Sequence, residues 1–148
     1  MALQLAKRSD VPIIVRLLAE DQIATVRDDP EGDMTPYLTA FDAIAARADD
    51  ALYVWEHDGA VVGCLQLTFL PGLLLKGGWR AQIEGVRVDS RYRRHGIGEH
   101  MIMAAVALAR DRGCRLVQLT TNKDRRDAHR FYRRLGFVAS HEGMKLML

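Results

Sequence analysis

Two neighbouring segments, 51–56 and 60–70, place the strongest constraint on how this chain can fold. Both are rich in residues that favour β-strands, and only His57, Asp58 and Gly59 separate them. Two such segments joined by a short linker that contains Asp-Gly are typical of an antiparallel hairpin. The fold must therefore contain a β-sheet.

The segments before this hairpin predict one short strand and two helices. Residues 3–7 alternate weakly and predict the strand. Ser9 or Asp10 can cap a helix that starts near Pro12 and fades near Arg27. An acidic, turn-rich loop covers 28–33, and a second helix follows from Thr35-Pro36 to about Ala48.

The segments after the hairpin alternate between strands and helices. A Leu- and Gly-rich loop at 71–78 leads to a strand at 82–88, in which Gly85 predicts a local bulge. The remaining expected elements are a helix at 97–112 ended by Gly113, a strand at 116–121, a helix capped by Asp127 and stopped by Gly136, and a closing antiparallel pair at 137–140 and 144–148. Together, these elements predict an α/β (α+β) fold with a mixed sheet, in one domain over 1–148.

Several classes of protein are disfavoured by what the sequence lacks. No apolar run reaches the roughly 18 residues of a membrane-spanning helix, and the first residues lack the order of a signal peptide. We therefore expect a cytoplasmic protein. Cys64 and Cys114 lie in apolar runs without metal-ligand spacing, which predicts buried, reduced thiols and no metal.

Charge is distributed unevenly along the chain. Residues 1–86 hold 7 Lys and Arg against 13 Asp and Glu, whereas 87–148 hold 14 against 6. Much of the positive charge falls in two short segments, 87–95 and 122–134. We expect an anionic ligand at these basic segments.

The stretch 82–99 carries the clearest signal for chemistry, because a strand, a basic loop, two glycines and a helix follow one another. Gly96 and Gly98 allow a ligand to approach the backbone closely, and the unpaired amides of the first helical turn attract anions. Arg91, Arg93, Arg94 and His95 add positive side chains. The stretch predicts a cradle for a diphosphate, although two glycines before a helix, taken alone, more often form a plain tight turn with a glycine N-cap.

Two familiar nucleotide motifs are absent from this stretch. A dinucleotide fingerprint would need glycine at the position of Met101, and a P-loop would need Gly-Lys followed by Ser or Thr. The sequence therefore points to neither NAD nor ATP.

Residues 93–98, Arg-Arg-His-Gly-Ile-Gly, resemble the Arg/Gln-x-x-Gly-x-Gly/Ala signature of the GNAT superfamily of N-acetyltransferases. A second segment, 127–137, resembles that family's Ala-x-x-Phe-Tyr-x-x-x-Gly-Phe motif. The expected order of elements, a strand, two helices, three strands, a helix, a strand, a helix and two strands, is also the GNAT order. The resemblance implies an acetyl-CoA-dependent N-acetyltransferase that acts on a primary amine of a small molecule, peptide or protein by direct attack on the thioester.

The resemblance also implies roles for particular residues. The main chain at Val86 and Val88 would pair with the pantetheine arm, and the cradle residues Arg93, Arg94, His95, Gly96, Ile97 and Gly98 would bind the diphosphate. Glu84 would be the general base, the backbone N–H near Val86 would polarise the thioester carbonyl, and Tyr132 would be the general acid. Each role has a plainer alternative: Val86, Val88 and Tyr132 as core residues, Glu84 as a structural acid, and the arginines as solvated charges.

The C-terminal motif departs from the family at one position. The family often has an asparagine three residues before the motif alanine, where this chain has Arg125, and Asn122 stands three residues earlier still. By resemblance, Asn122, Arg125 or His129 could contact the coenzyme. The apolar loop 73–75 could line the acceptor pocket, be core, or form a homodimer interface.

Three functions compete at this level. An enzyme is expected, with acetyl-CoA and an amine as partners, and the acid-rich segment 1–86 favours a cationic acceptor. The alternative is a non-catalytic acyl-CoA-binding or regulatory module on the same fold. A nucleic-acid partner is not expected, because the basic residues of 122–134 alternate with acids and no DNA-reading motif is visible. No membrane partner is expected either.

Overall fold

A computed structural model describes residues 2–20 and 27–148. The chain forms two compact parts, Met1–Gln118 and Leu119–Leu148. The expected continuation of the first helix toward Arg27 lies partly at 21–26, outside the described residues. We describe each part by itself.

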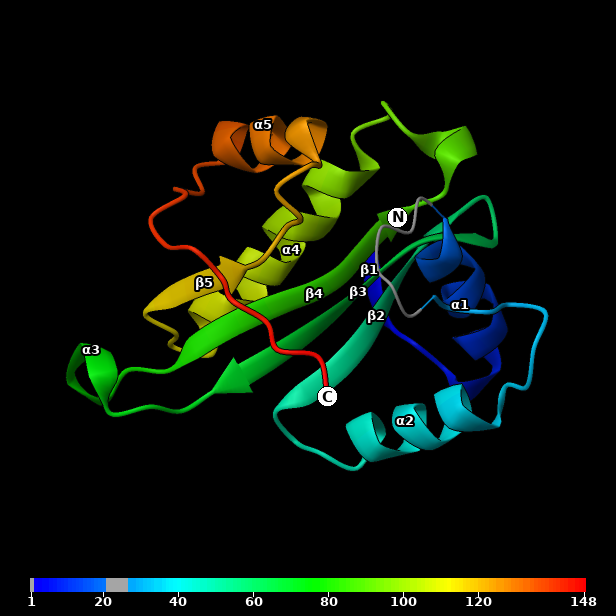
Figure 1. Ribbon diagram of the computed structural model, residues 1–148, viewed down its shortest axis with the longest axis horizontal. Coiled ribbons are helices and arrows are strands. Elements are labelled where there is room, and N and C mark those ends of the chain that lie inside the picture. Colours follow the sequence, from blue (N-terminus) through cyan, green and yellow to red (C-terminus); the bar gives the residue numbers. More distant parts are fainter. Residues whose placement is uncertain (1, 21–26) are drawn as a thin grey trace. The chain divides into compact units, whose positions relative to one another are not determined.

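The first part is built on a five-stranded sheet (Figure 1). Its strands are β1 (Leu3–Leu5), β2 (Asp50–His57), β3 (Ala60–Leu70), β4 (Arg80–Val88) and β5 (Leu116–Leu119), and they lie in that order across the sheet. The pairs β1–β2, β2–β3 and β3–β4 are antiparallel. β5 runs in the same direction as β4 in Figure 1, so the sheet is mixed as expected.

The predicted hairpin is confirmed as β2 and β3. His57 pairs with Ala60, and the turn between them is Asp58-Gly59. Both turn residues have positive φ, 50° for Asp58 and 78° for Gly59. A two-residue turn with left-handed backbone at both positions matches the twist of the flanking strands, which is why Asp-Gly suits this position.

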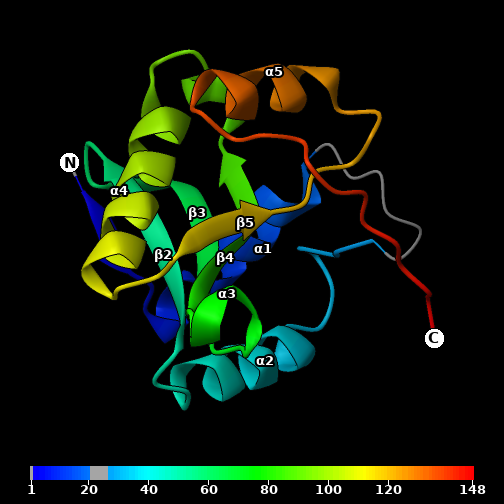
Figure 2. The same cartoon turned by 90° about the vertical axis from the view of Figure 1, so that its left-hand side faces the viewer.

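Helices cover both faces of this sheet. Figure 2 shows α4 (Ile97–Asp111) on one side, with α1 (Val11–Ala19) and α2 (Thr35–Ala45) on the other. α1 and α2 each have proline in the first turn, where its missing N–H costs no helical hydrogen bond. The loop 71–78 contains the single-turn α3 (Leu74–Gly77).

The core forms two layers because strand side chains alternate between faces. Leu65, Leu67 and Ile83 are buried together with Met101 and Ile102, which belong to the apolar stripe of α4. On the opposite face, Ile14 and Leu17 of α1 pack with Val54 and Cys64. The sheet is thus fixed between α4 and α1.

Gly85 forms the bulge that the sequence predicts in β4. Cys64 pairs with Arg87 and Gln66 pairs with Glu84, so one residue of β3 lies opposite two residues of β4, Gly85 and Val86. Gly85 has φ +60°, a backbone conformation that residues with a side chain rarely adopt. The bulge changes the direction of β4 immediately before the basic loop.

The second part contains α5 (Arg126–Arg134). Its N-cap is Arg125, so the expectation that Asp127 caps the helix is wrong, and Asp127 lies in the first turn instead. There its negative charge still interacts favourably with the positive end of the helix dipole. Gly136, with φ +98°, follows the helix as expected.

The expected closing strands at 137–140 and 144–148 do not form, although all of these residues are among those described. Val138, Met144, Leu146 and Leu148 are more than four-fifths exposed in this structure. A two-stranded pair gains stability mainly by packing a face on something else, and β-forming residues alone do not supply that burial.

The leucine-rich loop is not part of the core. Leu73 and Leu74 are 96% and 78% exposed, and Leu75 is half exposed. Leu75 and Lys76 both have φ of 58°, which is left-handed backbone. Among the described residues, no helix has the length and apolar character needed to cross a bilayer.

Candidate active site

The connection between β4 and α4 is a short loop. β4 ends at Val88, a 3₁₀ turn covers Ser90–Tyr92, and α4 begins at Ile97 with Gly96 as its N-cap. Gly96 has φ 76°, and Arg94 also has a positive φ of 67°. This left-handed backbone brings the chain sharply from the strand into the helix.

The first turn of α4 offers unpaired amides to a ligand. The N–H of His100 donates to the Gly96 carbonyl at 3.0 Å and closes the turn. Among the described residues, no side chain forms a hydrogen bond that caps the helix at Gly96. Ile97 and Gly98 precede His100, so their N–H groups have no acceptor within the helix and carry the positive end of its dipole. This arrangement suits a phosphate group.

Asp89 holds the loop in shape. Its carboxylate is buried at 6% exposure and accepts hydrogen bonds from the Arg91 backbone N–H at 2.9 Å and the Arg91 guanidinium at 2.8 and 3.1 Å. Its own N–H donates to the Val62 carbonyl at 2.8 Å. The hydrogen bonds from Arg91 lower the pKa of Asp89 below its usual value.

We expect Asp89→Ala to lower the free energy of unfolding at pH 7 by about 1.5–3 kcal/mol, the usual value for hydrogen bonds to a charged group. Because the folded pKa is lowered, this stabilisation is present above the unfolded-chain value of about 3.9 and is lost as pH falls through the folded value. Urea unfolding of both proteins at pH 7 and pH 3 measures it. Asp111→Ala, at an exposed carboxylate on α4, is the control; equal losses in the two variants would contradict this role.

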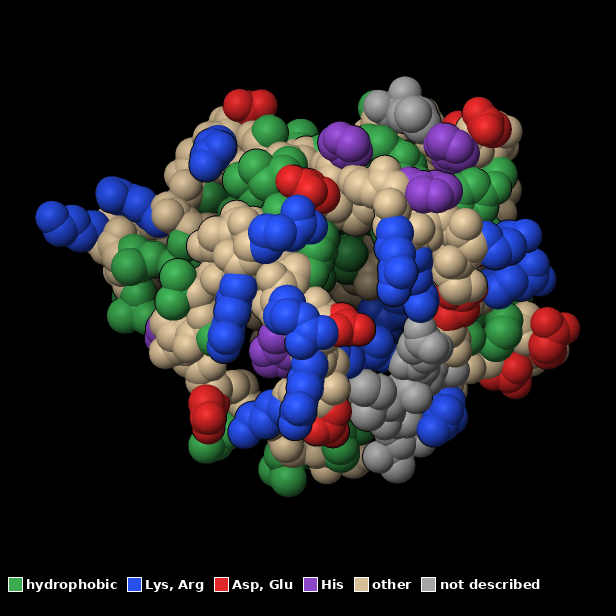
Figure 3. All heavy atoms as spheres, turned by 90° about the horizontal axis from the view of Figure 1, so that it is seen from above, with side chains coloured by type: hydrophobic (Ala, Val, Ile, Leu, Met, Phe, Trp, Pro, Cys, Tyr) green, Lys and Arg blue, Asp and Glu red, His purple; other side chains and the backbone are tan. Residues whose placement is uncertain are grey.

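The basic side chains of the cradle differ in their contacts. The Arg93 guanidinium lies 3.5 Å from the Glu20 carboxylate, and its Nε donates to the Val88 carbonyl at 3.4 Å. Arg94 and His95 are exposed. Figure 3 colours the Lys and Arg side chains blue, and many of them stand out from the surface. Arg93 therefore joins the loop to α1, and the amides are the better candidates for direct contact.

β5 is much shorter than β4, with four residues against nine. Gln118 of β5 bonds the side chain of Gln82, so the four residues of β5 lie beside the first half of β4. Val86 and Val88 lie in the second half and are half-buried, so neither is a fully buried core residue. The Val86 carbonyl accepts from the Arg87 guanidinium at 2.9 Å, which fixes the main chain at the bulge.

Glu84 lies just before the bulge with an exposed side chain. It pairs with Gln66 on β3, and Gln82 lies two residues before it on β4. Among the described residues no hydrogen bond or ion pair engages its carboxylate. A carboxylate in this position is free to accept a proton, directly or through water.

Cys64 faces the bulge but is not a nucleophile. Its thiol lies 3.6 Å from the Gly85 carbonyl, and burial raises its pKa to about 12, against the smaller effect of the nearby Arg87 charge. It therefore stays protonated. Among the described residues, no group of three or more His, Cys, Asp or Glu side chains could hold a metal ion.

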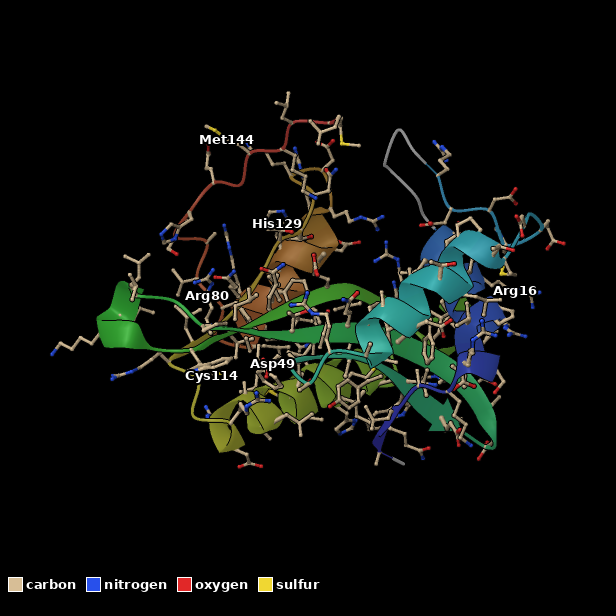
Figure 4. All side chains as sticks on the ribbon, turned by 90° about the horizontal axis from the view of Figure 1, so that it is seen from below. Arg16, Asp49, Arg80, Cys114, His129 and Met144 are labelled. Atoms are coloured by element: carbon tan, nitrogen blue, oxygen red, sulfur yellow. The ribbon has the colours of Figure 1, made fainter. Side chains whose placement is uncertain are left out.

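The second part brings together three of the predicted coenzyme contacts. The Asn122 carbonyl accepts from the Arg125 N–H at 3.0 Å and lies 2.9 Å from Nε2 of His129, while the Asn122 side chain accepts from the Asp124 N–H. Asn122 thus organises the turn into α5, from which His129 projects (Figure 4). Tyr132 is half-buried, and its ring lies 5.1 Å from that of Phe131 and 5.7 Å from that of Phe137.

Comparison with known proteins decides the family. The profile of the acetyltransferase (GNAT) family matches residues 14–137. This chain belongs to the GNAT family. The matched range includes β4, the basic loop, α4 and α5, so all the residues singled out here lie within the GNAT region.

Two curated GNAT relatives are named for their acceptors. The chain is 38% identical to an aminoalkylphosphonate N-acetyltransferase of Salmonella typhimurium over 85 residues, 57% of this chain and 54% of that protein. It is 34% identical to a glucosamine 6-phosphate N-acetyltransferase of Trypanosoma brucei brucei over 97 residues, 66% of this chain and 64% of that protein. The chain thus matches between half and two thirds of these relatives.

Solved structures match over almost the whole chain. A crystal structure described as a transcriptional regulator from Bacillus halodurans superimposes with a TM-score of 0.92 at 41% identity, covering 99% of each chain. A putative acetyltransferase from Agrobacterium tumefaciens gives a TM-score of 0.88 at 25% identity, covering 100% of each chain. The GNAT fold is therefore shown.

Sequence reasoning missed the residues that support the site. Asp89 follows the strand directly, where an Asx turn could have been expected. Glu20 gave no usable signal, because its partner, Arg93, is far away in the sequence and is recognised only in three dimensions.

Proposed function

We propose that this GNAT protein is an acetyl-CoA-dependent N-acetyltransferase that transfers an acetyl group to a primary amine. The observation that carries the proposal is the left-handed entry into α4 at Gly96, which leaves the Ile97 and Gly98 amides open at the end of a basic loop. These amides suit the diphosphate of coenzyme A. GNAT membership supports acetyl-CoA as the co-substrate.

In the proposed reaction the amine attacks the thioester directly. Glu84 takes the proton from the attacking nitrogen, and the backbone N–H near Val86 polarises the carbonyl. A C–N bond forms, the C–S bond breaks, and the departing thiolate takes a proton from Tyr132. The bulge at Gly85 supports this assignment, because it places Glu84 and Val86 on either side of one distorted backbone position.

The proposal is tested by measuring thiol release from acetyl-CoA across a panel of primary amines. Calorimetric titration with acetyl-CoA supplies the binding constant. We expect binding at micromolar concentration and thiol release with at least one amine. Absence of binding would overturn the proposal.

We expect Tyr132→Phe to slow turnover by about 10- to 1,000-fold with little change in acetyl-CoA affinity, because only the proton donated to the leaving thiolate is lost. Steady-state rates and calorimetry on the same preparation measure both quantities. Phe131→Leu, which alters the neighbouring ring on α5, is the control. An unaltered rate in Tyr132→Phe would show that this tyrosine is not the general acid.

A second candidate is a non-catalytic, acyl-CoA-binding regulatory module. It is favoured by one observation, the description of the 41% identical Bacillus halodurans structure as a transcriptional regulator. Acetyl-CoA binding without thiol release to any amine would support this module over the enzyme. A cytoplasmic location, a single domain and a homodimer remain predictions.

A further inference from the structure

We infer that Cys64 is a positioning residue for the proposed acetyl transfer: its thiol holds the Gly85 carbonyl and so aims the Val86 N–H at the thioester. This inference rests on the proposed function and names the side chain that prepares its polarising amide. Cys64 would not touch the reacting atoms. It would act only through the direction of one peptide group.

Cys64 lies on β3 beside the bulge of β4, where it pairs with Arg87. Its side chain is only 1% exposed and packs with Ile14 and Leu17 on the α1 face of the sheet. The thiol lies 3.6 Å from the Gly85 carbonyl oxygen and donates to it. Because burial raises the pKa of this thiol to about 12, the sulfur keeps its proton and can act as a donor.

The direction of the Val86 N–H follows from this contact. The Gly85–Val86 peptide is trans, since the described residues contain no cis peptide bond. In a trans peptide the carbonyl and the N–H point in opposite directions. Because the Gly85 carbonyl turns toward the thiol on β3, the Val86 N–H turns away from β3.

That side of β4 is the one that the proposed reaction uses. β3 occupies one edge of β4 through the antiparallel ladder, so a pantetheine arm that pairs with Val86 must use the other edge. The N–H that turns away from β3 therefore faces the coenzyme. A peptide rotated by half a turn would present the Gly85 carbonyl instead, and a carbonyl repels the developing negative charge of the thioester oxygen.

Gly85 alone does not fix the orientation of this peptide. Glycine adopts positive and negative φ with similar ease, so the peptide after Gly85, whose φ is 60°, can rotate at low cost. Leu18 of α1 packs close to the bulge, since a Cβ at Gly85 would lie 3.4 Å from Cδ2 of Leu18. This apolar contact offers no polar group to the peptide. The Cys64 thiol supplies the donor that favours one orientation over the other.

Arg87 holds the peptide that follows Val86. Its guanidinium donates to the Val86 carbonyl at 2.9 Å, and its main chain also hydrogen-bonds to the Cys64 thiol. The two peptides that flank Val86 are thus both held by side chains. A donor that is fixed before the reaction stabilises the charge that develops on the thioester oxygen without having to reorient.

The first test compares Cys64→Ala with Cys64→Ser. Both variants lose the packing of the sulfur, but only serine keeps a donor for the Gly85 carbonyl. We expect Cys64→Ala to lower kcat/KM for the amine at saturating acetyl-CoA by about 5- to 10-fold, the effect of one hydrogen bond, with the KM for acetyl-CoA changed less than about twofold. Cys64→Ser should recover most of this loss. Equal losses in the two variants, or no loss in either, would overturn the inference.

Two further variants separate the hydrogen bond from packing. Cys64→Val fills the space of the thiol without a donor, so it should lose as much turnover as Cys64→Ala. Cys114→Ala removes a half-buried thiol outside the bulge and should leave both constants unchanged. Full turnover in Cys64→Val would show that the site needs only an apolar side chain, and would overturn the inference.

The second test needs no turnover. The Val86 amide of ¹⁵N-labelled protein is compared in complexes with coenzyme A and with acetyl-CoA, which differ only by the acetyl group. We expect acetyl-CoA to move the Val86 amide proton further downfield in the unaltered protein and in Cys64→Ser, but not in Cys64→Ala. The same shift in Cys64→Ala would overturn the inference and leave the proposed function in place.

The outcomes for the proposed function and for Cys64 are distinguishable. If acetyl-CoA does not bind, the proposed function and this inference both fail. If acetyl-CoA binds but no amine is acetylated, the enzyme assignment fails, and the shift of the Val86 amide in the three proteins still decides whether Cys64 aims this N–H at the thioester.

Discussion

Gly96→Val should weaken acetyl-CoA binding at least about 100-fold, equivalent to about 2.8 kcal/mol. Gly96 is the N-cap of α4 and has φ 76°, which costs an L-residue about 1–2 kcal/mol and a β-branched residue more. A Cβ would lie 3.7 Å from the His100 ring, an ordinary contact, so the strain lies in the backbone. Relieving it would turn the Ile97 and Gly98 amides away from the diphosphate. Calorimetric titration measures the loss.

The other end of α4 provides a matched control. Gly113 has φ +81°, and apart from its chain neighbours no heavy atom of the described residues lies within 4 Å of the position that a Cβ would take, so Gly113→Val introduces the same kind of strain in open space. Thermal unfolding should show similar destabilisation of the two variants. Only Gly96→Val should lose acetyl-CoA binding. Normal acetyl-CoA binding by both variants would show that this loop does not bind the diphosphate.

Glu84→Gln should lower kcat about 10²- to 10⁴-fold, the range usual for loss of a general base. The amide keeps the size of the side chain but cannot accept the proton. Acetyl-CoA affinity should change less than twofold, because Glu84 precedes the bulge and the cradle follows it. Steady-state thiol release and calorimetry on the same protein separate the two effects.

The control for this variant is Glu56→Gln on β2, a half-buried carboxylate of the same sheet next to the hairpin turn. We expect it to keep both kcat and affinity. If Glu84→Gln retains full turnover, the proton leaves the amine by another route. If both variants lose turnover equally, the loss reflects damage to the sheet.

The features that the sequence predicted well are those set by local backbone chemistry. Asp58-Gly59 fixes the hairpin, because both residues take left-handed backbone. Gly85 marks the bulge, and Gly96 marks the entry into α4, for the same reason. The apolar stripe of α4 gives its buried face directly. These signals need only a few neighbouring residues, so one sequence is enough to reveal them.

The features that the sequence did not predict depend on partners far apart in the chain. Glu20 meets Arg93, and Asp50 meets Gln66 and Thr68, only after the sheet and α1 have assembled. The two expected C-terminal strands had suitable residues but find no burial in this structure, so their β propensity alone was misleading.

The most direct test of the diphosphate cradle is amide chemical-shift mapping of ¹⁵N-labelled protein during titration with coenzyme A. We predict that the Ile97 and Gly98 amides show the largest shifts, that Val86 and Val88 shift as well, and that pantetheine, which lacks the diphosphate, leaves Ile97 and Gly98 unmoved. Saturable binding of coenzyme A that leaves both helix amides unmoved would contradict the cradle.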